Sequence, residues 1–330
     1  MRSCFAAFYL VLLLGFQRTM GTVLSEPLTT SQQRDLENRI IGGTAPSQKR
    51  FPYYTYVMIG TGYGKSSACG GSLIAADVVL TAAHCLESDA YFGGSVLGVD
   101  VYVNSTTAKY SEYEYFRAGI DWVVHPDRDP EKLSNDIALI FLDTPVTGVP
   151  LVKINRDASI PVDVNPSALT AIGRGADIAN SADIDFFFPD YTFPDQLMQV
   201  AIYPVPIAPC RRTHGSYYVG ESNLCAGSGG DELKGACYGD SGGPVVMKKS
   251  SAQKDVQVGI VSWGSAGCSD ADKPEVLTRV SYFAGWIDEQ ICMKSNNKPS
   301  ACPTAYSSYY KEASKPPTKK PSIRPTTGKP

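Results

Sequence analysis

The chain has 330 residues, of which 43% are hydrophobic and 19% are charged, and its formal net charge is −3. Residues 295–330 carry seven basic side chains and one acidic side chain, so the body of the chain, residues 40–294, is strongly acidic. An acidic body argues against nucleic acid as a partner, whereas a basic tail can bind something anionic.

The first 21 residues are predicted to form a signal peptide. Arg2 precedes an apolar run from Cys4 to Phe16, which is too short to cross a bilayer and is typical of the apolar part of a secretion signal. A retained membrane anchor is the alternative interpretation. We expect a secreted, extracellular protein.

The cysteine content agrees with an oxidising compartment. Of nine cysteines, Cys4 leaves with the signal peptide, and the even number that remains is typical of a disulfide-bonded secreted chain. Spacing alone leaves about a hundred possible pairings. There is no C-x-x-C pair and no cluster of histidines, so we expect no metal site and no other cofactor.

Two apolar runs end or begin at residues that can do chemistry. In "VVLTAAHC", residues 78–85, a β-branched run leads to His84, which predicts a buried strand followed by a turn. In "SNDIALIFL", Asp136 stands at the head of a second strand-like run. Between the two runs lies the chain's only N-x-[ST] sequon, and we expect a glycan on its Asn104.

The stretch "GDSGGP", residues 239–244, contains a candidate nucleophile, Ser241. Its G-x-S-x-G pattern fits the nucleophile elbow of α/β-hydrolases, in which the histidine follows the serine in the chain. All three histidines precede Ser241, which excludes that arrangement; they are His84, His125 and His214. The surroundings of His84 favour the order His84, Asp136, Ser241, which is that of chymotrypsin-type proteases. We expect His125 to be structural and His214 to lie in a surface loop.

The last part of the chain predicts a strand, a helix and a tail. Residues 255–263 alternate as a half-buried strand does, and apolar residues recur on one face of a helix over 281–292. Residues 303–330 are rich in Pro, Thr and Lys, cannot bury a core and are expected to be disordered. This tail can hold the protein on anionic polysaccharide or matrix, carry O-glycans, or simply be solvated.

Taken together, the motifs resemble those of the trypsin/chymotrypsin family of serine proteases. Six segments occur in the family's order: "RIIGG" (39–43), "CGGSLI" (69–74), "LTAAHC" (80–85), "NDIALI" (135–140), "GDSGGP" (239–244) and "VSWG" (261–264). The resemblance implies an all-β fold of two six-stranded antiparallel Greek-key barrels, over about 40–150 and 160–280, with a C-terminal helix. With the signal peptide (1–21) and the basic tail (295–330) that composition predicts, it divides the chain further into a propeptide (22–39) and a protease domain (40–294).

The resemblance also implies a role for each site residue. Ser241 would attack the carbonyl carbon, His84 would act as base and then acid, and Asp136 would orient the imidazole. The backbone N–H groups of Gly239 and Ser241 would form the oxyanion hole.

Activation is implied by the same resemblance. Cleavage after Arg39 would free the ammonium of Ile40, which would pair with buried Asp240 and order the oxyanion loop. The chain would therefore be a zymogen.

Three disulfides follow from the resemblance, and a fourth is assigned by elimination. The implied pairs are Cys69–Cys85, Cys210–Cys225 and Cys237–Cys268. Cys292 and Cys302 are left over and are paired with each other, the alternative being that one of them is free or bonded to another molecule.

The substrate pocket departs from the family pattern. Gly235 stands where trypsins carry an aspartate, and Glu275 falls where the family usually has glycine. Ser262, Trp263 and Gly264 are expected to form the edge that pairs with substrate backbone. Three preferences for the side chain before the cut bond, P1, stay open: Arg or Lys through Glu275, mixed basic and aromatic, or small and apolar.

Two further departures concern the second barrel. Arg174 replaces a usual tryptophan, and the loop 176–196 is long, acidic and aromatic, so that it can restrict large substrates, dock a partner, or be a peripheral insertion. We expect a monomeric endopeptidase that acts on proteins and peptides and can be restrained by protein inhibitors. The alternative is a protease-like binding protein without turnover.

Overall fold

The structure is a computed structural model of the chain. It describes residues 40–62, 66–87, 95–107, 115–161, 167–176, 195–230, 234–265, 268, 270, 272–300 and 302. The chain divides into two units, residues 1–37 and 38–330, and all described residues belong to the second. The predicted signal peptide, the propeptide with Arg39, most of the loop 176–196 and the tail 303–330 lie outside the described residues.

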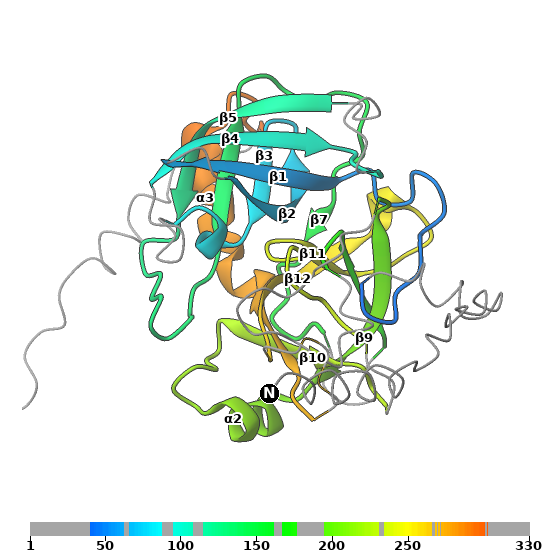
Figure 1. The fold of residues 1–330 in the computed structure, drawn as a ribbon. Helices are drawn as coiled ribbons and strands as arrows, with labels where there is room; N and C mark the ends of the chain where they lie inside the picture. Colours follow the sequence, from blue (N-terminus) through cyan, green and yellow to red (C-terminus); the bar gives the residue numbers. More distant parts are fainter. Residues whose placement is uncertain are drawn as a thin grey trace, which may run out of the picture. The chain divides into compact units, whose positions relative to one another are not determined.

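Six strands close the first barrel in the order β1-β2-β3-β6-β5-β4, with every neighbouring pair antiparallel. These strands are β1 (Tyr54–Thr61), β2 (Ser66–Ala75), β3 (Val78–Thr81), β4 (Val96–Val103), β5 (Tyr115–Val124) and β6 (Ala138–Leu142). Every residue of β3 and β6 is buried, which explains why both read as unbroken apolar runs rather than as alternating strands. Figure 1 shows these strands together in blue to green.

The second barrel has the order β11-β8-β9-β10-β13-β12 and closes where β11 pairs with β12. Its strands are β8 (Leu169–Gly173), β9 (Met198–Val205), β10 (Asn223–Gly227), β11 (Pro244–Met247), β12 (Val256–Trp263) and β13 (Glu275–Arg279). A short strand, β7 (Lys153–Ile154), runs parallel to the start of β12 and joins the sheet from outside. The two six-stranded antiparallel barrels confirm the predicted fold class.

Helices flank the barrels. The predicted C-terminal helix is α3 (Ala284–Lys294), preceded by a 3₁₀ turn (Val280–Phe283), and its buried side chains join the core of the first barrel. A second helix, α2 (Ile207–His214), was not expected. Only Cys210 of α2 is buried, so this helix lacks the apolar face that would have indicated it in the sequence. None of the helices among the described residues is long and apolar enough to span a membrane.

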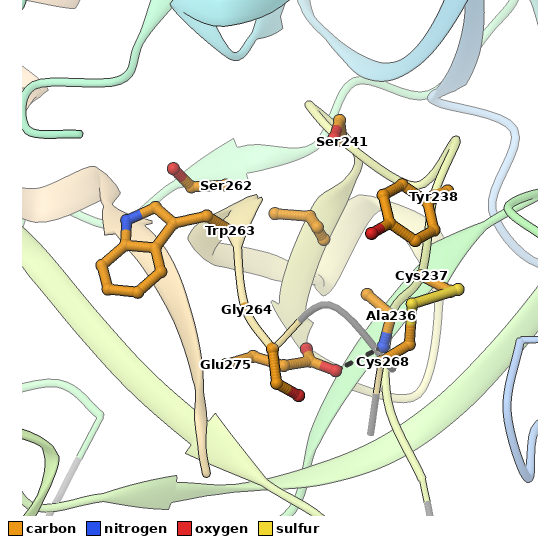
Figure 2. Close-up of a pocket in the computed structure, with 11 residues that line it drawn as sticks. Ala236, Cys237, Tyr238, Ser241, Ser262, Trp263, Gly264, Cys268 and Glu275 are labelled. Carbon is orange, nitrogen blue, oxygen red and sulfur yellow. Dashed lines mark hydrogen bonds between the residues drawn. A yellow bond between two sulfur atoms is a disulfide. The ribbon is translucent and has the colours of Figure 1, made fainter. Parts of the chain in front are cut away.

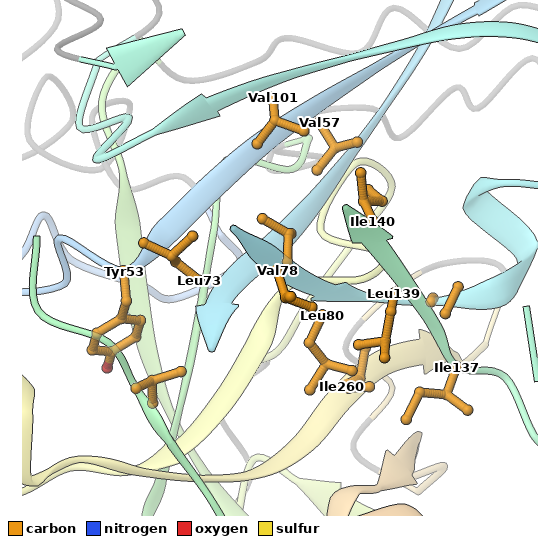
Figure 3. Close-up of a cluster of buried hydrophobic side chains, with 14 of the residues drawn as sticks. Tyr53, Val57, Leu73, Val78, Leu80, Val101, Ile137, Leu139, Ile140 and Ile260 are labelled. Carbon is orange, nitrogen blue, oxygen red and sulfur yellow. The ribbon is translucent and has the colours of Figure 1, made fainter. Parts of the chain in front are cut away.

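One buried cluster connects the two barrels. Inward-facing side chains of β1, β2, β3, β4 and β6 form a large part of it, and Ile260 of β12 packs against them (Figure 3). Ile172 and Val246, also from the second barrel, belong to the same cluster. This shared packing holds the barrels at a fixed spacing, which is what a site built from both of them requires.

Four disulfides join Cys69–Cys85, Cys210–Cys225, Cys237–Cys268 and Cys292–Cys302. These are the pairs that the resemblance and the elimination implied. The first ties the turn after β3 to β2, and the third lines the pocket described below.

Candidate active site

His84 lies in a 3₁₀ turn (Ala83–Cys85) that follows β3. The turn is held from both sides, because Ala82 and Ala83 are fully buried and Cys85 is bonded to Cys69 in β2. The sulfurs of that disulfide lie within 4.8 Å of the His84 ligand nitrogen. Disulfide sulfurs are not thiolates, so this group does not have the donors of a metal site.

Asp136 directly precedes Ile137 and β6 and is 3% exposed. Its Oδ2 lies 2.7 Å from Nδ1 of His84, and its Oδ1 accepts the backbone N–H of His84 at 2.9 Å. Because an ionised carboxylate only accepts hydrogen bonds, Nδ1 carries the proton and Nε2 keeps its lone pair. Asp136 therefore fixes both the tautomer and the orientation of the ring.

Two residues of the second barrel hold Asp136 in turn. The hydroxyl of Ser262 donates to Oδ2 at 2.5 Å, and the hydroxyl of Thr278 donates to the backbone carbonyl of Asp136 at 2.6 Å. Neither contact was predicted, since Ser262 was expected only at the substrate edge. No local pattern could have indicated them, because each partner is more than a hundred residues away in the chain.

The electrostatics of this pair favour a charged acid and a basic histidine. Burial raises the pKa of Asp136, but the charge and hydrogen bond of His84, with smaller contributions from Arg128 and Ser262, hold that pKa well below its usual range. Desolvation lowers the pKa of His84, and the charge and hydrogen bond of Asp136 outweigh it, so the pKa of His84 is raised above 6.5. The imidazole is thus a stronger base than a free histidine.

Ser241 lies in a loop pinned to both barrels. Its carbonyl accepts the N–H of Gly70 in β2 at 2.7 Å, and the next residue, Gly242, donates to Val261 in β12 at 2.8 Å. Ser241 and His84 line one cavity on the side of the first barrel. Ser241 therefore shares a cavity with His84, which contacts Asp136, although the three residues come from distant segments.

Gly239 has φ = 93°, in the left-handed region that glycine adopts without strain. A side chain at this position would be strained, which accounts for a glycine two residues before Ser241. The conformation is compatible with the predicted use of its N–H group as an oxyanion donor, a role that stays a prediction.

Asp240 is buried between two glycines of the second barrel. Its Oδ1 accepts the N–H of Gly175 at 2.6 Å, and its Oδ2 accepts the N–H of Cys237 at 2.9 Å. A Cβ on Gly173 or on Gly175 would overlap the carboxylate. Burial raises the pKa of Asp240 to about 6, although both hydrogen bonds act in the opposite direction.

Ile40, the first described residue, is fully buried in the core cluster of the second barrel, together with Ala236. The following residue, Ile41, pairs with Gly235, whose N–H donates to the Ile41 carbonyl at 3.2 Å. The segment 40–41 thus packs against the chain that leads to Asp240.

A pocket of about 220 Å³ opens beside Ser241. Figure 2 shows Ser241 at one end and Glu275 at the other. The lining residues are Ala236, Cys237, Tyr238, Ser241, Val261, Ser262, Trp263, Gly264, Ser265, Cys268 and Glu275. Three of the predicted substrate-edge residues, 262–264, line it. Gly235 does not, because it faces Ile41, and Ala236 takes its place.

Glu275, the first residue of β13, is only 8% exposed. Its Oε1 accepts the N–H of Ala236 at 2.6 Å. Its Oε2 is buried and has no hydrogen-bond partner among the described residues. The pKa of Glu275 is raised to about 8: burial raises it most, the hydrogen bond from the Ala236 N–H lowers it, and the charge of Asp240 raises it.

The other two histidines have structural surroundings. His125 is buried with its ring 5.0 Å from those of Phe283 and Trp286, as expected. His214 is not in a loop: it is the last residue of α2, and its Nε2 lies 2.7 Å from the Pro274 carbonyl while its ring packs on Trp263. It supports the pocket wall from behind.

Asn104 and Arg174 lie where the two barrels meet. Arg174 donates to Ser105 Oγ at 3.0 Å and to the Thr107 carbonyl at 2.9 Å, and its guanidinium stacks on Tyr56. Asn104 is 7% exposed in the folded chain. Little of its side chain is therefore accessible to a glycan, and glycosylation stays a prediction from the sequon.

The barrels and their site define a serine protease fold, and the sequence agrees. Residues 40–287 match the family model described as Trypsin. The chain belongs to the trypsin family. It is 33% identical over 260 residues to the vitellin-degrading protease of Bombyx mori, covering 77% of this chain and 86% of that protein. It is 31% identical to brachyurin of Leptuca pugilator, covering 76% and 98% of the two chains.

A solved structure shows the same fold. HL collagenase superposes with a TM-score of 0.63 at 24% identity, and the match covers 77% of this chain and 100% of that one. At this identity the likeness concerns the fold alone.

Proposed function

We propose that the chain is a secreted serine endopeptidase that becomes active when the Arg39–Ile40 bond is cut. The observation that carries the proposal is the 2.7 Å contact between Nδ1 of His84 and Asp136, in a cavity that His84 shares with Ser241. A buried acid, a correctly protonated imidazole and a hydroxyl in one place are the requirements for nucleophilic attack on an amide.

The reaction follows from that arrangement. Ser241 Oγ attacks the carbonyl carbon while its proton passes to Nε2 of His84. The N–H groups of Gly239 and Ser241 stabilise the oxyanion, and His84 then gives the proton to the leaving amine. A water molecule, deprotonated by His84, hydrolyses the acyl-enzyme and restores Ser241.

Zymogen activation is supported by the surroundings of Asp240 and Ile40. Asp240 is a buried carboxyl that accepts hydrogen bonds from the backbone N–H groups of Gly175 and Cys237, and a buried carboxylate is stabilised by a cation. Cleavage after Arg39 would create such a cation at Ile40, whose segment packs beside that loop. Four disulfides support export to an oxidising compartment.

The pocket supports a preference for Arg or Lys at P1. Glu275 lies opposite Ser241 at the far end of the pocket, and its free Oε2 is an acceptor for a guanidinium or ammonium group (Figure 2). We propose that Glu275 is the specificity residue. It would take the role of the aspartate that trypsins carry at the position of Gly235.

A fluorophosphonate probe tests the proposed activity. The full chain is cut after Arg39, its new N-terminus is verified, and the probe is added before and after cutting. Strong labelling only of the cut chain, lost in Ser241→Ala, is the expected result. Absence of labelling in a correctly cut chain would instead indicate a protease-like binding protein without turnover.

A further inference from the structure

We propose that Glu275 gives the pocket two states with different substrates: a protonated state that accepts uncharged P1 side chains, and an ionised state that accepts Lys or Arg. In this scheme a cationic P1 side chain expels the proton of Glu275 to solvent as it binds. The inference rests on the proposed function and concerns the regulation of its specificity.

The lining of the pocket is almost entirely uncharged. Apart from Glu275, its lining is made of apolar groups, hydroxyls, a disulfide and backbone, with no cationic side chain among the described residues. Val261, Ala236 and the Cys237–Cys268 disulfide form apolar walls that suit an uncharged side chain. Such a pocket serves hydrophobic substrates whenever its one acid is neutral.

The Glu275 carboxyl is only partly hydrogen-bonded in the described part of the chain. Oε1 is occupied by the Ala236 N–H, and Oε2 has no partner in the described part of the chain. An ionised carboxylate buried with a single donor is costly, because it loses its hydration without gaining a cation. A proton on Oε2 removes that cost and provides a donor to the pocket.

The charge that acts on Glu275 from its surroundings is negative. The loop 237–243 contributes Asp240, which is negative when ionised and disfavours a second negative charge nearby. Neighbouring β10 places uncharged Ala226 opposite Glu275, and β12 contributes Trp263. Tyr238, at the pocket mouth, carries a phenol. Lys273, two residues before Glu275, is 54% exposed and is paired with Asp270.

These surroundings fix the direction of the pH effect. The pKa of Glu275, raised to about 8 by burial and by Asp240, means that the empty pocket holds a proton at neutral pH. Binding of a cation converts the carboxyl into a carboxylate and releases one proton. Affinity for a cation should therefore rise about tenfold per pH unit up to the pKa of Glu275 and then level off. Affinity for an uncharged probe should not rise.

Benzamidine and its uncharged analogue benzamide test this without catalysis. Titration calorimetry is done on the cut Ser241→Ala chain from about pH 6 to about pH 9, in buffers with different heats of ionisation. We expect about one proton released per benzamidine near pH 6, almost none near pH 9, and an affinity about 50-fold higher near pH 8 than near pH 6. Benzamide should show neither effect.

Two double variants test whether Glu275 is the source of the released proton. Each adds one substitution to Ser241→Ala. Glu275→Gln should bind benzamidine weakly and without proton release, but should keep its affinity for benzamide, which shows that the pocket is intact. Glu221→Gln removes an acid from an exposed site outside the pocket and should behave as the parent does.

Three results would overturn the inference: benzamidine binding with no proton release near pH 6, no binding at any pH, or proton release that persists in Glu275→Gln. These results do not bear on the proposed protease activity. That activity is tested independently by fluorophosphonate labelling of the cut chain that retains Ser241.

Discussion

The hydroxyl of Ser262 and the ring nitrogen Nδ1 of His84 both contact the same oxygen of Asp136, at 2.5 Å and 2.7 Å. Ser262 belongs to the second barrel and His84 to the first, so the acid between them is oriented from both sides. Because Asp136 contacts Nδ1 of His84, the contacts that orient the carboxylate also orient the imidazole. The barrel interface therefore acts directly on the candidate base.

Loss of the Ser262 hydroxyl should weaken catalysis without removing it. Ser262→Ala leaves Asp136 with one donor fewer, and a hydrogen bond to a charged group contributes about 1.5–3 kcal/mol. We expect kcat/KM for peptide amides to fall about 10- to 100-fold. Ser262→Thr, which keeps a hydroxyl, should recover part of the loss. Unchanged kcat/KM in Ser262→Ala would show that this contact does not position Asp136.

The pH dependence of activity should report the raised pKa of His84. Activity requires neutral His84, so kcat/KM should fall as pH decreases through a pKa that lies above 6.5. Asp136→Asn removes the charge that raises this pKa and disturbs the tautomer, and kcat should fall about 10⁴-fold. An acid limb that is the same in both proteins would exclude His84 as the titrating base.

Gly239→Ala tests the candidate oxyanion hole. Its φ of 93° is strained for alanine, so the N–H at 239 should turn away. We expect kcat to fall about 10²–10³-fold with the fold retained. Gly98→Ala is the matched control, because a Cβ on Gly98 meets nothing within 4 Å and should not change kcat. Circular dichroism checks folding in both.

Ile40→Gly tests activation. Ile40 is fully buried among second-barrel side chains, and glycine removes that anchor while leaving the new ammonium. We expect the variant to be secreted and cut but to label poorly with fluorophosphonate. Full labelling of the cut variant would refute the switch.

Stability should fall with rising pH because of Glu275. Its pKa is raised from 4.5 to about 8, so between these values the folded chain holds a proton that the unfolded chain has lost. The native state binds more protons, and the free energy of unfolding therefore decreases as pH rises through this window. Denaturant titrations from about pH 5 to about pH 8 should show a shallower decrease in Glu275→Gln than in the parent. Parallel curves would contradict burial of an uncompensated acid.

Local sequence patterns predicted the strands before His84 and after Asp136, the strand over 255–263, the order of the three catalytic candidates and the C-terminal helix. The apolar runs before His84 and after Asp136 follow from neighbouring residues, and so does the helical face of 281–292. These features depend on spacing within a few positions, which a single chain displays directly. The six motifs in order then indicated the barrels. Helix α2 was missed because it buries only Cys210.

Which other residues complete the site follows from the packing of the barrels and not from any local pattern. Ser262 and Asp136 are 126 residues apart, and Ala236 and Glu275 are 39 apart. Their contacts exist because closure and register of the barrels bring those positions together. The same closure turned Gly235 away from the pocket and buried Glu275 with one oxygen unpaired. Burial and pairing are properties of the packed chain, and for that reason the protonation of Glu275 could not be inferred from its place in the sequence.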